Sequence, residues 1–267
     1  MKILCPIDFS VASVDAVRYA VALISKIADP HIELLHCIFP GLRSTIFTNY
    51  SDFLGDRVRE DMDTLIGEFG QTNAHIKFSQ VILRGNPLDL VPAHISKNEF
   101  DYTVIGTKGL NSVKEMIMGS LTERLFEKAT CPTLAIPQAY VFHVMENVVL
   151  AVDDEMISSE AVTRPLVSIV KGHSSRLKLL HVRQKGDTKL EYDPELDAYL
   201  TEIPFDYYSK YTAGSVNKAI NEVCQDTNAD LLCLIHRHRG WMLNVFHRSQ
   251  VREELFRMSM PILVLRD

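Results

Sequence analysis

The sequence predicts an α/β protein made of two tandem open doubly wound domains, each with a parallel sheet. Two observations support this fold class. The chain repeats itself at a constant offset, and short apolar runs rich in β-branched residues alternate with amphipathic helical patterns within each repeat. Near-continuous apolar strands between helices are typical of a parallel sheet covered on both faces, with right-handed crossovers.

The repeat is clearest at two strand-like segments of each half. "ILCPIDFS" matches "VVLAVDDE", and "IELLHC" matches "LKLLHV". Asp8 and Asp153 in the first pair are 145 positions apart (153 − 8), and so are His36 and His181 in the second (181 − 36). Later segments match too: "DYTVIG" at Asp101 with "DLLCLI" at Asp230, and "CPTLAIP" at Cys131 with "MPILVLR" at Met260. A duplicated domain accounts for these matches.

The first repeat alternates between strand and helix patterns along its whole length. We expect strands near 2–7, 31–38, 76–83, 101–105 and 132–136, with helices near 13–28, 52–72, 87–97 and 116–128 between them. In the second repeat, the stretch between His181 and Ile203 is too polar and acidic for a full crossover helix. We place the domains at 1–138 and 146–267, and the short, moderately apolar link between them predicts close packing.

The composition argues against several classes of protein. The chain has 267 residues, of which 46% are hydrophobic and 23% charged, as is typical of globular domains with a sizeable core. Its net charge of −6 argues against a general affinity for nucleic acid or anionic membranes. The five cysteines form no C-x-x-C pair and indicate reduced core thiols, and no apolar run reaches the length of a membrane span. We therefore expect a cytoplasmic protein that binds neither nucleic acid nor membrane.

A segment with three glycines, "VIGTKGLNSVKEMIMGSLTERL", follows the fourth expected strand of the first repeat. Ligands of open α/β sheets bind at the carboxyl ends of the strands, where the strand order reverses. Gly106 and Gly109 would let the backbone turn and approach a ligand there. Gly119 and Ser120 would begin a helix whose unpaired N–H groups favour a phosphate, with the hydroxyl of Thr122 as a further donor. The segment therefore predicts a polyphosphate site.

Two further positions lie at the same edge of the expected sheet. Asp8 ends the first strand and Cys37 ends the second. The glycine spacing fits neither the P-loop nor G-x-G-x-x-G, and turn geometry alone often requires glycine, so a purely structural turn is the alternative. The convergence of these positions on one edge favours a ligand site.

The spacing G-x2-G-x9-G-[ST], the start "PIDFS" and the letters "LLH" before Cys37 together resemble the ATP-binding universal stress proteins in their tandem form. The resemblance covers nearly the whole chain. It implies that each domain is Rossmann-like, of the adenine-nucleotide alpha-hydrolase type. It also implies a pseudo-two-fold pair within one chain, formed through the last strands near 132–136 and 261–265. Assembly of whole chains into a homo-oligomer is compatible with this arrangement.

The resemblance implies a role in ATP binding for individual residues. Asp8 would accept hydrogen bonds from the ribose or the base, and the backbone at Cys37 would meet the adenine edge. The whole expected set is Pro6, Asp8 and Ser10 in the first motif, Cys37 at the base, Gly106 and Gly109 along the ribose and phosphates, and Gly119, Ser120 and Thr122 at the phosphates. Lys108 would add a cation to the phosphate path or stand as a solvated loop lysine. A bound triphosphate usually brings magnesium.

We expect a stress-response protein that binds ATP in its first domain and acts as a nucleotide-dependent sensor or switch, read by an unidentified protein partner. Two alternatives stay open: a slow ATPase or nucleotidyl-transfer enzyme in the same pocket, and a nucleotide-free protein-interaction module. The sequence shows no paired catalytic acids, Ser-His-Asp order or zinc signature, so we assign no catalytic and no metal residues. His36 is expected to be a packed, hydrogen-bonded histidine.

The second repeat departs from the glycine pattern in "LIHRHRGWMLNVFHRSQVREEL". Ile235 or His236 stands in place of Gly106, depending on a gap of one residue, and Arg248 replaces Gly119. Asp153 persists. We therefore expect one competent nucleotide site per chain. The replacement stretch is basic, and it predicts another anion site, a metal site at the H-x-H pair or, most simply, a solvated or partner-facing surface.

Overall fold

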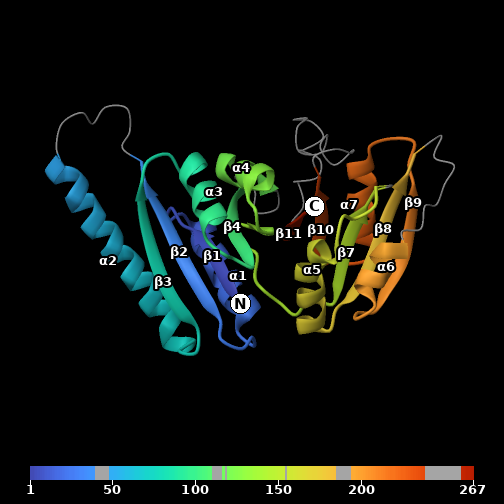
Figure 1. The fold of residues 1–267 in the computed structure, drawn as a ribbon, viewed down its shortest axis with the longest axis horizontal. Coiled ribbons are helices and arrows are strands. Elements are labelled where there is room, and N and C mark those ends of the chain that lie inside the picture. Colours follow the sequence, from blue (N-terminus) through green and yellow to red (C-terminus); the bar gives the residue numbers. More distant parts are fainter. Residues whose placement is uncertain (40–47, 110–115, 118, 154, 185–193, 238–259) are drawn as a thin grey trace. The chain divides into compact units, whose positions relative to one another are not determined.

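The computed structural model describes residues 1–39, 48–109, 116–117, 119–153, 155–184, 194–237 and 260–267. The chain divides into two compact units, the first containing Met1–Thr107 and Gly119–Phe142 and the second containing Lys108–Met118 and His143–Asp267. Each unit has a parallel sheet with helices on both faces (Figure 1). This arrangement confirms the α/β fold class.

The first unit has the strand order β3-β2-β1-β4-β6, and all neighbours in this sheet are parallel. The order reverses between β1 and β4, which is where ligands bind in open α/β sheets. The elements of this half of the sequence are β1 (Lys2–Pro6), α1 (Val11–Ile24), β2 (His31–Ile38), α2 (Thr48–Thr72), β3 (Lys77–Arg84), α3 (Pro87–Lys97), β4 (Tyr102–Gly109), β5 (Met116–Ile117), α4 (Ser120–Lys128) and β6 (Thr133–Pro137). Of these, β5 and the end of β4 are grouped with the second unit.

The second unit repeats this plan with the parallel order β11-β10-β7-β8-β9. Its elements are β7 (Asn147–Val152), α5 (Glu160–His173), β8 (Arg176–Arg183), α6 (Pro194–Leu200), β9 (Phe205–Tyr211), α7 (Val216–Asp226), β10 (Leu231–His236) and β11 (Ile262–Arg266). Among its described residues, the second crossover contains the seven-residue α6, where the first unit has the 25-residue α2. The polar, acidic composition of this stretch predicted that no full helix would form there.

One aspartate in each unit fastens the start of its first strand. Asp101 accepts a hydrogen bond from the backbone N–H of Lys2 at 2.6 Å. Asp230 likewise accepts from the N–H groups of Glu146 and Asn147, at 2.7 and 2.9 Å. Both aspartates stand just before the strand that pairs with the first one, as the matched "DYTVIG" and "DLLCLI" segments predict.

The structure corrects the sequence-based boundaries around the glycine segment. We expected β4 to end near 105, but it continues to Gly109 and pairs antiparallel with the short β5. Residues 116 and 117, expected to be helical, belong to β5, and α4 begins at Ser120. Gly106 lies inside a strand, at a point where the backbone of Ala12 approaches, which is a common use of a strand glycine and not a sign of a turn.

The described cysteines fit the expected core thiols in large part. Cys5, Cys131, Cys224 and Cys233 are buried, Cys37 is half-buried, and all are free. Burial raises the pKa of the Cys37 thiol to about 11 and that of Cys224 to about 12, so neither is a thiolate at neutral pH. Within the part of the chain that the structure describes, no helix is long and apolar enough to cross a membrane.

Candidate functional site

The carboxyl ends of β1, β2 and β4 bring most of the expected site residues to one edge of the first sheet. Pro6 pairs with Leu35 at the end of β1, and the next residues lead into α1. Cys37 lies one residue before the end of β2. Because β1 and β4 are neighbours on either side of the reversal, the turn after β1 faces the end of β4.

Asp8 is held by the first turn of α1. Ser10 is the N-cap of this helix, and its hydroxyl accepts from the N–H of Ser13 at 3.3 Å. The Oδ1 atom of Asp8 accepts from the Ser10 hydroxyl at 2.5 Å and from the Ser10 N–H at 3.0 Å. Partial burial acts to raise the pKa of Asp8, but the hydrogen bonds from Ser10 and Ser13 outweigh it and leave that pKa below its ordinary value. Asp8 is therefore an exposed, ionised acceptor.

The turn between β1 and α1 is also fixed from the side of β2. Phe9 has a positive φ of 62°, which is unusual for a bulky residue. Its ring lies 5.2 Å from the ring of His36, whose Nδ1–H donates to the carbonyl of Ile7 at 2.8 Å. His36 is thus the packed, hydrogen-bonded histidine that the sequence predicted. Backbone strain of this kind persists where the surroundings impose it, and functional sites often contain it.

Gly106 is required by the packing of α1 against β4. A Cβ atom at this position would lie 2.1 Å from the carbonyl oxygen of Ala12 and 2.4 Å from its carbonyl carbon. These are backbone atoms and cannot move aside without displacing the start of α1. The fold therefore explains Gly106, which we had expected to admit a ligand.

At position 119, no contact with a described residue requires a glycine. Gly119 is the N-cap of α4 with φ −75° and ψ 156°, a conformation open to any residue. A Cβ atom added there would meet no described atom within 4 Å. As a glycine, it also provides no side chain to cap the helix, so the first N–H groups of α4 gain no capping bond from it. Among the described residues, the position thus combines space for a side chain with the positive end of a helix dipole.

The remaining residues expected to contact phosphates differ in their exposure to solvent. Ser120 is exposed at the first turn of α4, whereas Thr122 is 1% exposed, and its hydroxyl does not face the solvent. Gly109 is the last residue of β4 and stands opposite Met116 in the hairpin with β5. The side chain of Lys108 lies outside the described part of the structure.

The strand register aligns the second unit with the first without ambiguity. Thr103 pairs with Thr133 in one sheet, and Leu232 pairs with Ile262 in the other, both at matching points of the last two strands. Counting along these strands places Ile235 at the counterpart of Gly106. The same count places Arg237 at the counterpart of Lys108. The gap that the sequence left open is thereby closed in favour of Ile235.

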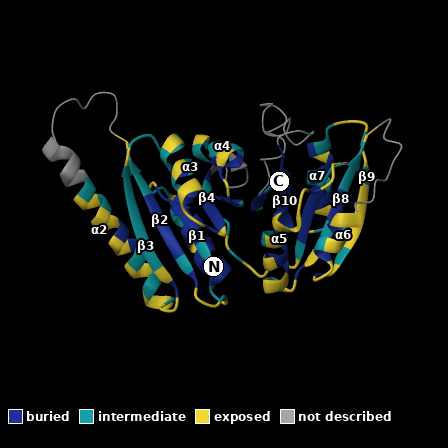
Figure 2. Ribbon diagram, viewed as in Figure 1, coloured by how far each residue is buried: buried dark blue, intermediate teal, exposed yellow. Residues whose placement is uncertain are grey.

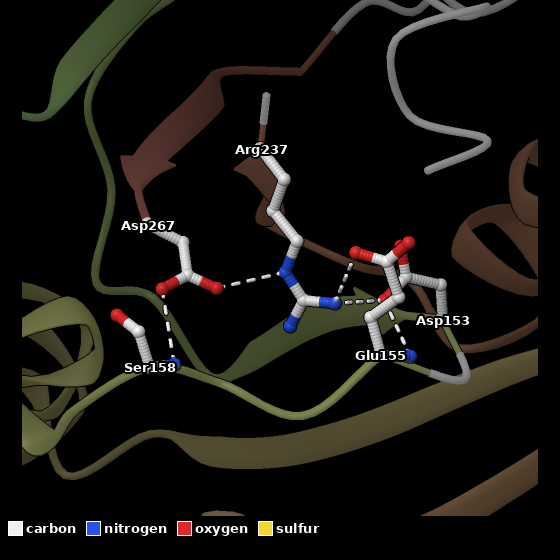
Figure 3. Close-up of polar contacts among 5 residues, drawn as sticks. All are labelled: Asp153, Glu155, Ser158, Arg237 and Asp267. Carbon is white, nitrogen blue, oxygen red and sulfur yellow. Dashed lines mark hydrogen bonds and ion pairs between the residues drawn. The ribbon is translucent and has the colours of Figure 1, made fainter. Parts of the chain in front are cut away.

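In the second unit, Arg237 occupies the edge beside Asp153 (Figure 3). Its Nη1 bonds the carboxylate of Asp153 and lies 3.9 Å from that of Glu155, and its Nε donates to Asp267 at 2.8 Å. Asp267 in turn accepts from the N–H of Ser158 at 3.0 Å. The side chains of Arg237, Asp153 and Asp267 are 7%, 6% and 6% exposed. The guanidinium thus ties together three separate segments of the unit.

The charges of this cluster do not balance. One guanidinium faces three carboxylates, and burial raises the pKa of Asp153 above its ordinary value although the charge of Arg237 opposes this. Phosphates would be repelled here and would have to displace a buried ion pair. The sequence placed Arg237 in a basic surface stretch, and this was wrong, because the residue is buried and paired within its unit. Its carboxylate partners are distant in sequence, so local charge patterning gave no sign of them.

Most of that basic stretch lies outside the described residues, including His238, Arg239, His247, Arg248 and Arg252. His236 is described and is 8% exposed on β10. Among the described residues, no group of three or more His, Cys, Asp or Glu side chains is arranged to hold a metal ion.

Comparison with known proteins identifies the family. The model of the universal stress protein family matches residues 1–137. The chain belongs to this family. A universal stress protein of Methanocaldococcus jannaschii is 26% identical over 143 residues, which cover 51% of this chain and 81% of the relative.

Two solved structures resemble the whole chain in fold. A universal stress protein from Archaeoglobus fulgidus has a TM-score of 0.76 at 19% identity, and the match covers 99% of this chain and 96% of that one. A protein described as a putative universal stress protein from Pseudomonas aeruginosa has a TM-score of 0.62 at 15% identity, covering 99% and 92%. At these identities the likeness shows the universal stress protein fold and nothing further.

Proposed function

We propose that the first unit binds an adenine nucleotide, ATP, at the edge formed by β1, β2 and β4, and that the protein works as a nucleotide-dependent sensor. The observation that carries the proposal is Gly119. Neither its backbone conformation nor a contact with any described residue requires a glycine, and Ser120 beside it is exposed at the start of α4. A phosphate placed there would receive the first N–H groups of the helix and the hydroxyl of the exposed Ser120.

The other end of the nucleotide fits the turn after β1. Asp8 is ionised and exposed, so its carboxylate can accept a hydrogen bond from a ribose hydroxyl. Because Ser10 and Ser13 hold the carboxylate and the turn in place, the acceptor is ordered before a ligand arrives. The backbone at Cys37 would meet the base at the end of β2.

The second unit would not share this activity. The three carboxylates around Arg237 leave its edge negative and filled, whereas Asp8 stands with hydroxyl groups at its own edge. We therefore propose one nucleotide per chain. Magnesium would accompany the triphosphate through phosphate oxygens and water, because the described residues offer no cluster of ligands for it.

Binding can be tested on the full chain by calorimetric titration with ATP and magnesium. We expect one site per chain, and binding should be lost in Gly119→Glu, where a carboxylate would occupy the phosphate position. Gly119→Gln has nearly the same volume without the charge and should bind more weakly than wild type but better than Gly119→Glu. Gly119→Ala should keep binding. Equal affinities for the glutamate and alanine variants would show that no phosphate lies at α4.

The sensor part of the proposal requires a segment that responds to the ligand. A ligand shifts a conformational equilibrium only by its different affinity for the two states. We expect ATP to slow amide hydrogen exchange across 106–120 in the wild type and not in Gly119→Glu. If ATP binds without changing exchange in this segment, the protein binds nucleotide but the proposed switch does not exist.

A further inference from the structure

The outer strand of the second unit, β9, carries exposed aromatic side chains on both faces of the sheet. In the described structure β9 pairs with β8 on one side and with no strand on the other. Tyr207, Tyr208 and Tyr211 are 53%, 39% and 56% exposed. Exposed aromatic residues on an open strand edge are unusual, because such edges readily pair with another chain.

The matching strand of the first unit is better covered. There, β3 carries the long α2 against it, and its inner residues are half-buried. In the second unit the described part of the crossover is the short α6, and most of β9 is exposed from residue 206 onward (Figure 2). The exposure of β9 is what distinguishes it from β3.

The backbone groups that face the open edge can be read from the bonds to β8. Pro204 accepts from Leu177 through its carbonyl, and Thr212 donates to Arg183 through its N–H. Neighbouring residues of a strand direct their backbone groups to opposite sides, so even-numbered residues between these two face β8. The N–H and C=O groups of the odd-numbered residues 205, 207, 209 and 211 consequently face outward.

We propose that β9 pairs antiparallel with β9 of a second copy of this chain, around a two-fold axis at Tyr208. In this register, Phe205 stands opposite Tyr211 of the second copy, and Tyr207 stands opposite Ser209. These are the outward-facing residues, so they form the hydrogen-bonded pairs of the ladder. A two-fold interface of this kind closes after two chains, and all seven residues of β9 take part.

The charges of β9 favour this partner over an unrelated strand. Asp206 and Lys210 are the charged residues of "FDYYSKY", and they lie two positions on either side of Tyr208. The two-fold therefore places each Asp206 opposite a Lys210 of the other copy. These pairs are not hydrogen-bonded through the backbone, which is where opposing side chains come closest. Lys210 already lies 3.3 Å from Glu222 on α7, and Asp206 of the second copy would add a second carboxylate.

The pairing can be tested by charge exchange between two variants of the full chain. Asp206→Lys alone places lysine opposite lysine, and Lys210→Glu alone places acid opposite acid. We expect a concentration-dependent dimer for the wild type in sedimentation equilibrium, and a dissociation constant about tenfold higher or more for each variant alone. An equimolar mixture of the two variants restores opposite charges in both pairs, so it should associate as well as the wild type.

Two further variants separate pairing from folding. Ser209→Pro removes an outward N–H without touching the bonds to β8 and should abolish the dimer, whereas Ser209→Ala should not. Circular dichroism and thermal unfolding check that each variant is folded. The proposal is overturned if the wild type is monomeric at every concentration, if Ser209→Pro still dimerises, or if the mixed variants fail to associate.

Discussion

Asp8 and Asp153 stand at equivalent points of the two units, yet their surroundings differ in kind. Asp8 is exposed and held by hydroxyl and N–H groups of Ser10, whereas Asp153 is buried against the guanidinium of Arg237. The first arrangement leaves an acceptor open to a ligand. The second satisfies the carboxylate from within the protein. The difference shows how equivalent edges of two repeats diverge once the chain supplies its own cation to one of them.

The two edges also differ in how closely the first helix approaches the sheet. In the first unit the turn between strand and helix covers residues 7–10, and α1 packs against Gly106. In the second unit the corresponding turn covers 153–159, and Ile235, 3% exposed, takes the place of the glycine. The isoleucine side chain needs the space that the start of α1 occupies in the first unit. A longer turn fits this need, because it lets α5 begin farther along the chain.

The largest expected effect on stability comes from removing the buried guanidinium of Arg237. Arg237→Met keeps most of the side-chain volume but leaves the carboxylates of Asp153 and Asp267 buried without their partner. Breaking a buried ion pair in this way costs about 3–5 kcal/mol of unfolding free energy. Denaturant unfolding of the full chain measures the loss.

An exposed arginine provides the control for this experiment. Arg18 pairs with Asp15, but its side chain is 63% exposed, so Arg18→Met should cost less than about 1 kcal/mol. A second comparison, Arg237→Lys, keeps the charge and loses the planar fork, and it should fall between the two. If Arg237→Met were as stable as Arg18→Met, the cluster would not hold the second edge together.

The next largest effect on stability is expected at Gly106, whose counterpart in the second unit is Ile235. Gly106→Ala would drive a Cβ into the backbone at Ala12, and we expect a loss of about 3 kcal/mol. Gly119→Ala meets no described atom and should cost less than about 1 kcal/mol, the usual difference between glycine and alanine at an N-cap. Thermal or denaturant unfolding of both variants gives the comparison. Equal losses would mean that α1 does not depend on the close approach to β4.

The sequence was sufficient to predict the five strands of the parallel sheet in the first unit, because short apolar runs between helical patterns are typical of buried strands. It was sufficient for the carboxylate at Asp8 as well, since a residue that follows a buried strand must lie at the sheet edge. It misplaced the end of β4 because a glycine within a strand and a glycine in a turn look alike without the neighbouring backbone. The contact of Gly106 with Ala12 joins residues that are far apart in the sequence.

The Arg237 cluster was beyond prediction for a related reason. Asp153 lies 84 residues and Asp267 lies 30 residues from Arg237 in the chain. Burial of the arginine depends on both carboxylates reaching it at once. A local run of basic residues carries no sign of that, and it is typical of a solvated surface. The pairing of β10 with β7 brings Arg237 to Asp153, and its pairing with β11 brings the same residue to Asp267; the sequence shows neither pairing.

The smallest expected effect is on the pH dependence of the unfolding free energy, to which Asp8 and Asp153 should contribute in opposite directions. The folded-state pKa of Asp8 lies below its ordinary value of 3.8, so the stability it contributes is fully present above that value and is lost as the pH falls below it. The pKa of Asp153 is raised, so its contribution is present below 3.8 and is lost as the pH rises through the folded-state pKa. Unfolding free energies of wild type, Asp8→Asn and Asp153→Asn should be measured across the acid range. With rising pH, the unfolding free energy of the wild type should increase relative to Asp8→Asn and decrease relative to Asp153→Asn. If both differences change with pH in the same direction, the view that hydrogen bonds govern the pKa of Asp8 and burial that of Asp153 is contradicted.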